Sequence, residues 1–253
     1  TKRAFRIRDR YVTDPEYMKV DPSSFLASEA LDKLAAEISP DTALPWPEEA
    51  EPGDTVWLGA ADSEGRVVSF IQSIYWEFGS GVVVSGAGYL LNNQMDDFSA
   101  KVGVPNKFGV IGNDRNAIEP GKRMLSSMTP TILLRDGKPA LVIGTPGGST
   151  IFTSVYQVIL NVYDFNMPLQ QAVDALRFHH QLPAARLIRH DQREVPASTV
   201  AGLEALGYTV EPNDWGNLGD IQAIALEGNE VTAAADARGR GVARAVPMPS
   251  QKP

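Results

Sequence analysis

Thr55 is the residue of this chain whose type and position best suit nucleophilic chemistry. It stands in Gly53-Asp54-Thr55-Val56-Trp57, where an acidic, proline-rich stretch ends and an apolar run begins. A threonine hydroxyl is a weak nucleophile unless a base takes its proton, and the α-amine of a newly formed N-terminal threonine can supply that base. A threonine at the start of a strand is usually only a β-former. The functional interpretation therefore depends on the rest of the chain.

Gly147 and Gly148 could stabilise the negative oxygen that such an attack creates. They lie in the loop 144–149, just before an apolar run that predicts a helix through about Tyr163. Glycine lets backbone N–H groups approach a reacting carbonyl, and the helix N-terminus adds positive potential. Such donors lower a barrier by roughly 3–4 kcal/mol. In isolation, Pro-Gly-Gly is more often a plain turn.

The composition excludes several other classes of function. The chain has 253 residues and a net charge of -8, without a Lys/Arg stripe, which argues against nucleic-acid binding. It has no cysteine, so disulfides and thiolate zinc sites are excluded, and no apolar run is long enough to cross a membrane. Two of its three histidines, His179 and His180, are adjacent, which is not metal-ligand spacing on a helix. We expect no metal and no cofactor.

Hairpins and helices occur in blocks that would position these residues. Strand-like runs at 55–61 and 66–74 flank the turn 62–65, and runs at 131–135 and 139–143 flank Asp136-Gly137. Two late strands, 221–226 and 231–234, flank the turn 227–229. Because strand pairs and helices do not alternate strictly, the pattern favours an α+β fold with an antiparallel sheet.

The remaining elements are helices and one linker. Residues 28–38 predict a helix with Ser28 as N-cap and Pro40 as its stop. Further helices are predicted from Pro168, in a first-turn position, and over 198–206, where Gly207 ends the helix. Residues 40–54 are too rich in proline for a helix or a central strand, so we expect an exposed, extended linker there.

Five segments, in order and at specific spacing, carry a resemblance to a known family. The chain resembles the γ-glutamyltranspeptidase family of N-terminal nucleophile hydrolases over nearly its whole length. The segments are Leu90-Leu91-Asn92-Asn93-Gln94-Met95-Asp96-Asp97-Phe98, Pro120-Gly121-Lys122-Arg123, Leu125-Ser126-Ser127-Met128-Thr129-Pro130-Thr131, Pro146-Gly147-Gly148-Ser149 and Arg177-Phe178-His179-His180-Gln181.

The resemblance implies a four-layer αββα sandwich and self-cleavage between Asp54 and Thr55. Residues 1–54 would be the end of the large subunit and residues 55–253 the small subunit, so the remaining N-terminal portion of the large subunit is an expected partner. Thr55 would attack the γ-amide carbonyl of a small γ-glutamyl compound such as glutathione. The acyl-enzyme would then pass to water or to an amino acid or peptide amine. The family also implies a periplasmic or secreted location.

The resemblance also assigns residues to substrate binding. Asp97 and Gln94 would hold the α-ammonium of the substrate, because a carboxylate suits a buried cation and an amide oxygen is a neutral second acceptor. Ser126 and Ser127 would donate to its α-carboxylate. Without the family match, an exposed acidic turn and a polar loop would be the preferred interpretations of these residues.

Three positions differ from the family pattern. Ser73 replaces a threonine whose hydroxyl bonds the nucleophile, so that role can survive, and we expect Ser73 on the strand paired with that of Thr55. Tyr75 replaces an asparagine that touches the substrate, and Phe108 replaces a tyrosine of the lid loop 103–109 whose hydroxyl bonds that asparagine. The hydroxyl would thus have moved from lid to strand.

Two alternatives stay open. The changes at Tyr75 and Phe108 are similar to the cephalosporin-acylase branch, which hydrolyses glutaryl-type amides, whereas Asp97 would be left without a cation there. A catalytically silent, unprocessed fragment is the other alternative, because the family's essential arginine lies N-terminal to the residues matched here. His179 and His180 are interpreted as packing residues, and Asp236 with Arg238 as a structural pair.

Overall fold

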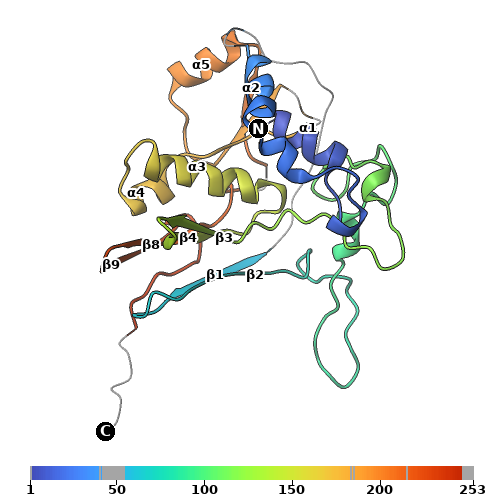
Figure 1. Cartoon of the computed structure of the whole chain (residues 1–253), viewed down its shortest axis with the longest axis horizontal. Helices are drawn as coiled ribbons and strands as arrows, with labels where there is room; N and C mark the ends of the chain where they lie inside the picture. Colours follow the sequence, from blue (N-terminus) through green and yellow to red (C-terminus); the bar gives the residue numbers. More distant parts are fainter. Residues whose placement is uncertain are drawn as a thin grey trace.

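The computed structural model describes residues 2–39, 41, 55–182, 184, 186–214 and 216–246. Asp54 and nearly all of the predicted linker 40–54 lie outside this part. Two sheets and a layer of helices stack face to face (Figure 1). The helices and sheets confirm the α+β class, and three layers in the order α, β, β are seen within the described residues.

The middle layer is an antiparallel sheet in the order β3-β4-β8-β9. Its strands are β3 (Thr131–Arg135), β4 (Lys138–Gly144), β8 (Gln222–Glu227) and β9 (Glu230–Ala235). The two hairpins predicted in this sheet, β3–β4 and β8–β9, are confirmed. At the β3–β4 turn, Asp136 (φ 52°) and Gly137 (φ 76°) adopt the left-handed region that a tight hairpin requires. The apolar run of β4 is explained by its central place, since residues 140–143 are at most 8% exposed.

Helices α3 (Ile151–Tyr163) and α4 (Leu169–Asp174) cover one face of this sheet (Figure 1). Leu141 and Ile143 of β4 pack there against Val155 and Val158 of α3, and all four are at most 2% exposed. Full burial of such side chains contributes roughly 1.5–3 kcal/mol each. This core fixes the distance between β4 and α3, and hence the turn that joins them.

The second sheet, β1 (Val56–Ala61) paired with β2 (Val67–Gln72), lies against the other face of the middle sheet. Trp57 fills the space between the two sheets, and glycine is needed beside it: a Cβ at Gly144 would lie 2.0 Å from the Trp57 ring. The indole Nε1 donates to Ser69 Oγ over 2.9 Å. Val56, Leu58, Val68 and Phe70, on the outer face, are each more than half exposed.

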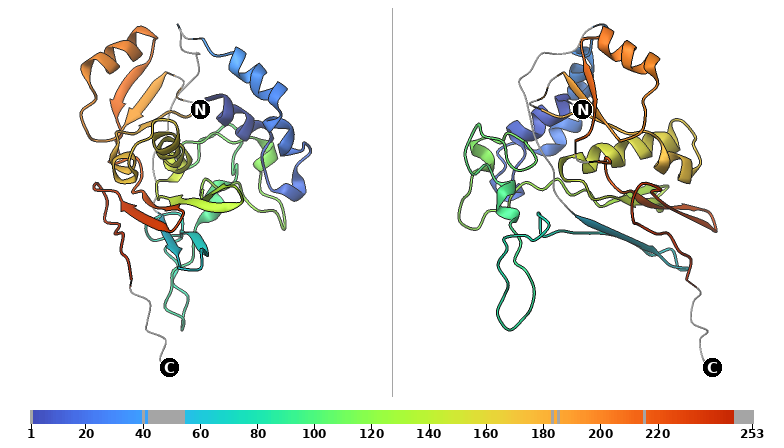
Figure 2. Two further views of the ribbon diagram at one scale, coloured as in Figure 1. Left: turned by 60° about the vertical axis from the view of Figure 1, so that its left-hand side comes forward. Right: turned by 180° about the vertical axis from the view of Figure 1, so that it is seen from behind.

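The other elements surround these layers (Figure 2). A three-stranded sheet with a parallel β6–β7 pair, which the sequence did not predict, adjoins α5. The remaining bounds are α1 (Lys2–Tyr11), η1 (Pro15–Tyr17), η2 (Pro22–Leu26), α2 (Ser28–Ala36), η3 (Gln94–Asp97), η4 (Asp114–Asn116), η5 (Gly148–Thr150), β5 (Phe178–His179), β6 (Leu187–His190), α5 (Ala197–Ala205) and β7 (Thr209–Pro212).

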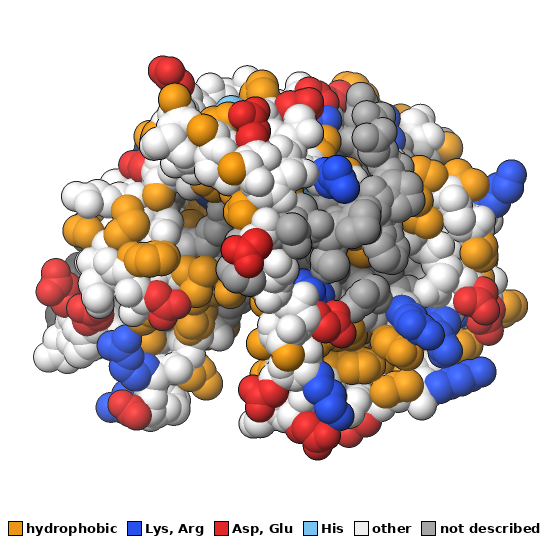
Figure 3. Space-filling view, turned by 90° about the horizontal axis from the view of Figure 1, so that it is seen from above, with side chains coloured by type: hydrophobic (Ala, Val, Ile, Leu, Met, Phe, Trp, Pro, Cys, Tyr) orange, Lys and Arg blue, Asp and Glu red, His pale blue; other side chains and the backbone are white. Residues whose placement is uncertain are grey.

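Three predicted helix starts are wrong by one residue, and one of them is that of the helix predicted over 198–206, since α5 starts at Ala197. Ser28 is the first residue of α2, and Ala27 holds the N-cap position without a side-chain bond. Pro168 is the N-cap of α4 instead of a first-turn residue. None of the helices in the described part combines the length and apolar character needed to cross a bilayer. On the face shown in Figure 3, acidic and basic side chains are interspersed.

Candidate active site

Thr55 and Ser73 meet at the open end of the β1–β2 hairpin. Thr55 precedes β1 and Ser73 follows β2, and the pairing of Val56 with Gln72 places the two residues opposite each other. Thr55 Oγ1 donates to Ser73 Oγ over 3.2 Å, and the backbone N–H of Tyr75 donates to the same oxygen over 2.8 Å. Ser73 lies one residue beyond β2, the strand on which we expected it. The register of the hairpin still brings its hydroxyl to Thr55, the candidate nucleophile.

Gly147 and Gly148 form the turn between β4 and α3. Both have positive φ angles, 137° and 54°. A Cβ at Gly148 would lie 2.5 Å from the Phe108 ring, and one at Gly147 would lie 2.6 Å from Thr150 Oγ1. Both positions therefore require glycine. Because η5 starts at Gly148 and α3 follows it, the turn places glycine backbone at the positive end of a helix, which suits an oxyanion.

Tyr75 has a left-handed backbone conformation. Its φ of 77° is unusual for a bulky residue, and its side chain is almost wholly buried. Its ring stands edge-on to Phe108, with centroids 4.7 Å apart. Burial, with the neighbouring Asp97 and Asp96 carboxylates, raises the pKa of the Tyr75 hydroxyl, which therefore stays protonated. Tyr75 lies outside β2, and its hydroxyl donates to Asp96 Oδ2 over 2.9 Å.

Asp97 is a buried carboxylic acid on η3, only 7% exposed. Gln94 Nε2 donates to its Oδ2 over 2.5 Å. Burial raises the pKa of Asp97 from 3.8 to about 7; the Gln94 bond and the charge of Arg8 lower it, and the charge of Asp96 raises it further. A cation placed beside Asp97 would offset the cost of burying its charge and restore full ionisation.

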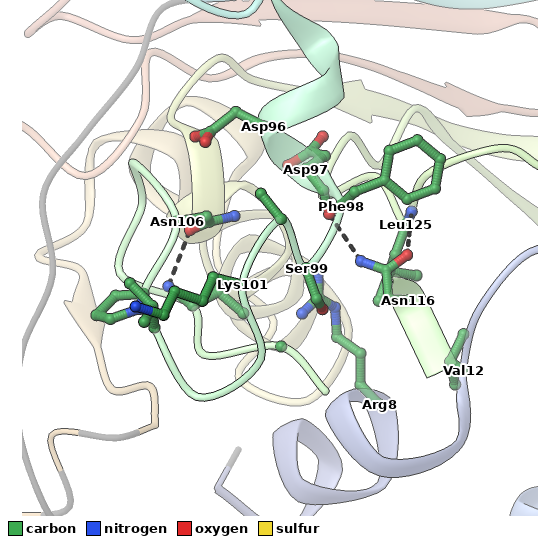
Figure 4. A pocket seen from close by; sticks show the side chains of 15 residues that line it. Arg8, Val12, Asp96, Asp97, Phe98, Ser99, Lys101, Asn106, Asn116 and Leu125 are labelled. Carbon is green, nitrogen blue, oxygen red and sulfur yellow. Dashed lines mark hydrogen bonds between the residues drawn. The ribbon is translucent and has the colours of Figure 1, made fainter. Parts of the chain in front are cut away.

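A cavity of about 230 Å³ adjoins Asp97. Arg8 reaches toward it from α1, with Asp96 and Asp97 on the opposite side (Figure 4). Arg8 Nη2 also donates to Ser127 Oγ over 3.3 Å, and Ser126 Oγ accepts from the Met128 N–H over 3.2 Å. Arg8 thus connects Ser127 with the Asp97 region. No local sequence pattern indicated a role for this arginine, because it lies 119 residues before its partner.

His179 has the environment of a packing residue, as predicted. Its Nδ1 lies 2.8 Å from Thr153 Oγ1 and its Nε2 lies 2.8 Å from Gln181 Oε1. Burial lowers the pKa of His179 to about 4, so it is neutral at pH 7. Among the described residues, no cluster of three or more His, Cys, Asp or Glu side chains is suited to a metal.

The predicted pair of Asp236 and Arg238 is confirmed, with Asp236 Oδ1 2.7 Å from Arg238 Nε. The pair belongs to a larger buried cluster with Arg177 and Asp191. Arg177 Nε donates to the carbonyl of Leu218 over 2.7 Å, and its Nη2 donates to the carbonyl of Gly219. Gly219 packs against the turn between β4 and α3. The cluster therefore supports the glycine turn from behind.

Comparison with known proteins gives a consistent result. The family model for gamma-glutamyltranspeptidase matches residues 1–246. The glutathione hydrolase proenzyme of Pseudomonas aeruginosa is 52% identical over 95% of this chain, and the chain spans 44% of that relative. The structure of the gamma-glutamyltranspeptidase from Pseudomonas nitroreducens complexed with L-DON is 54% identical, with a TM-score of 0.71 over 76% of this chain and 99% of the other. Cephalosporin acylase from Bacillus halodurans is 30% identical, with a TM-score of 0.77 over 92% of this chain and 41% of the other.

Proposed function

The chain belongs to the γ-glutamyltranspeptidase family, and from this premise we propose that it carries the nucleophile of a self-processing hydrolase and transferase for γ-glutamyl amides such as glutathione. The observation that carries the proposal is the hydroxyl pair of Thr55 and Ser73, 3.2 Å apart at the residue where cleavage is expected. Relatives named as glutathione hydrolase proenzymes support the choice of substrate.

In the proposed reaction, Thr55 Oγ attacks the γ-amide carbonyl while the α-amine of the same residue takes its proton. The N–H groups of Gly147 and Gly148 would stabilise the oxyanion. Collapse expels the amine, which receives the proton, and leaves a γ-glutamyl ester on Thr55. Water or the amine of an amino acid or peptide then attacks this ester. Ser73 would hold the Thr55 hydroxyl through the bond described above.

The acyl group would be recognised at both ends of its amino-acid moiety. Asp97 and Gln94 would bind the α-ammonium, and Ser126 and Ser127 the α-carboxylate, while Tyr75 and Phe108 would provide apolar walls. The raised pKa of Asp97 supports this assignment, since the carboxylate needs a cationic partner. We place residues 1–54 in a large subunit, together with a further N-terminal portion as partner, and residues 55–253 in the small subunit of a periplasmic or secreted heterodimer.

A second candidate function is a glutaryl acylase of the same fold. It is favoured by the apolar contact of Tyr75 with Phe108 and by the likeness to the cephalosporin acylase. The buried Asp97 argues against it, because a glutaryl group brings no cation.

Replacing Thr55 tests the proposal. In the full-length protein, Thr55→Ala should abolish both self-cleavage and hydrolysis of γ-glutamyl-p-nitroanilide, whereas Thr55→Ser should retain part of each, because one hydroxyl serves both steps. N-terminal sequencing of wild type should find a species that begins Thr55-Val56-Trp57. Normal processing of the alanine variant would refute the assignment, and an unprocessed wild type would favour a silent fragment.

A further inference from the structure

The loop 103–109 is a preformed unit that packs against the glycine turn. Asn106 organises it from within: its Oδ1 accepts from the N–H groups of Phe108 and Val110, both over 3.0 Å, and its carbonyl accepts from Gly109 over 2.8 Å. The Phe108 ring then contacts Gly148 so closely that a Cβ there would clash with it. Because the internal bonds do not fix the place of the loop, other groups must hold it against the turn.

Asp96 is the group that ties this loop to the segment after the β1–β2 hairpin. Its Oδ2 accepts from the Tyr75 hydroxyl and from the backbone N–H of Lys107, both over 2.9 Å. The carboxylates of Asp96 and Asp97 point apart, so the two neighbours serve different places (Figure 4). Hydrogen bonds to an ionised acceptor are the stronger ones, and here one oxygen joins two segments that lie far apart in the sequence.

The partner of Asp96 is itself held in an unfavourable conformation. Tyr75 has a left-handed backbone, and such strain persists only where the surroundings enforce it. Its N–H donates to Ser73, its ring packs on Phe108 and its hydroxyl meets Asp96. A chain of contacts therefore runs from Thr55 through Ser73, Tyr75 and Asp96 to the loop that covers Gly148.

We propose that Asp96 is a positioning residue, which locks the loop 103–109 onto Tyr75 and so keeps Phe108 on the candidate oxyanion turn. Two further contacts assist it: Gln181 Nε2 donates to the Phe108 carbonyl over 3.0 Å, and the Lys107 ammonium lies 4.0 Å from the centroid of the Trp76 ring. The catalytic consequence rests on the proposed function, whereas the lock itself does not.

Limited proteolysis of the full-length protein measures the lock without any substrate. Trypsin can cut after Lys107 only when the loop leaves its place, because the following residue, Phe108, is buried. Under brief digestion the rate follows the open population. Asp96→Ala removes the shared acceptor. Loss of one hydrogen bond to a charged group shifts the equilibrium between the closed and the open loop by about ten- to a hundredfold. We expect cleavage after Lys107 to rise at least about tenfold.

Three variants control this experiment. Asp96→Asn keeps an acceptor oxygen and should restore much of the protection. Tyr75→Phe should open the loop, and adding it to Asp96→Ala should have little further effect, since both remove the same bond. Asp114→Asn, an exposed carboxylate near the same loop, should behave as wild type.

Two results would overturn the proposal. One is a rate of cleavage after Lys107 in Asp96→Ala that stays within about twofold of the wild-type rate, because loss of the bond should raise this rate further. The other is a lowered melting temperature with faster cutting throughout the protein, which would make Asp96 a support of the fold only. In processed enzyme, Asp96→Ala should also lower kcat/KM for γ-glutamyl-p-nitroanilide. A wild type without Thr55-dependent hydrolysis would refute the proposed function and leave the proteolysis result intact.

Discussion

The pKa of Asp97 predicts opposite pH dependences for two acyl groups. A γ-glutamyl amide presents an α-ammonium and should bind when Asp97 is ionised, so its kcat/KM should rise with pH through the pKa of about 7. A glutaryl amide has no cation, and an ionised, buried Asp97 would be left unpaired beside it. The contribution of Asp97 to the kcat/KM of the glutaryl amide should therefore fall over the same range.

The size of the effect follows from the titration of one group. With a pKa of about 7, the ionised fraction of Asp97 rises about 25-fold between about pH 5.5 and about pH 7.5. The α-amine of Thr55, with an ordinary pKa of about 7.7–8.0, titrates nearby. It affects both substrates equally, so the ratio of their kcat/KM values isolates Asp97.

The assay compares γ-glutamyl- and glutaryl-p-nitroanilide across this range with processed wild-type enzyme and with Asp97→Asn. In wild type, the ratio should increase at least about 25-fold in favour of the γ-glutamyl substrate, and near neutral pH that substrate should be preferred. In Asp97→Asn the ratio should be flat, and the preference should narrow or reverse. A wild-type ratio that is constant with pH would refute the reasoning, and a preference for glutaryl throughout would favour the acylase.

Three further substitutions test the surroundings of Thr55. Ser73→Ala should lower kcat more than it raises KM, because Ser73 bonds the nucleophile; an unchanged kcat with a raised KM in steady-state kinetics would assign Ser73 to substrate contact instead. Gly148→Ala should lower kcat at least about tenfold, since its Cβ would displace Phe108, and wild-type turnover would show that the turn tolerates a side chain. Asp236→Asn should lower the unfolding free energy measured in urea by about 3–5 kcal/mol, because Arg177 loses a buried charge partner. A loss below about 1 kcal/mol would mean that the bonds of Arg177 to backbone carbonyls are enough to stabilise its buried charge.

Local patterns were sufficient for the hairpins and the apolar helix. Asp136-Gly137 requires positive φ at both residues, and the run 140–143 is apolar on both faces because β4 is central. The sheet β5-β6-β7 escaped prediction because its strands have two to four residues and pair across long separations. Strands this short have too few residues for alternation to show.

The sequence named the candidate site residues but not the partners that set their geometry. Resemblance pointed to Tyr75 and Phe108 as departures, and their edge-on contact follows from the fold. The hydroxyl of Tyr75 was expected to replace a lid hydroxyl, yet it bonds Asp96, a residue to which the resemblance assigned no role. Side-chain partners of this kind depend on backbone directions such as the positive φ of Tyr75, which is not encoded by residue type.

The proposed cleavage at Thr55 would divide the chain into two parts that contact each other. Asp14 accepts from the Arg123 backbone N–H and from its guanidinium Nη2, both over 2.8 Å, and these bonds lower the pKa of Asp14 to about 2. Arg8 reaches Ser127 from the same N-terminal region. The segment that carries the candidate carboxylate-binding serines is therefore held by residues from before the junction. Cutting the chain would free the Thr55 amine while these contacts keep both pieces, and the acyl pocket, in place.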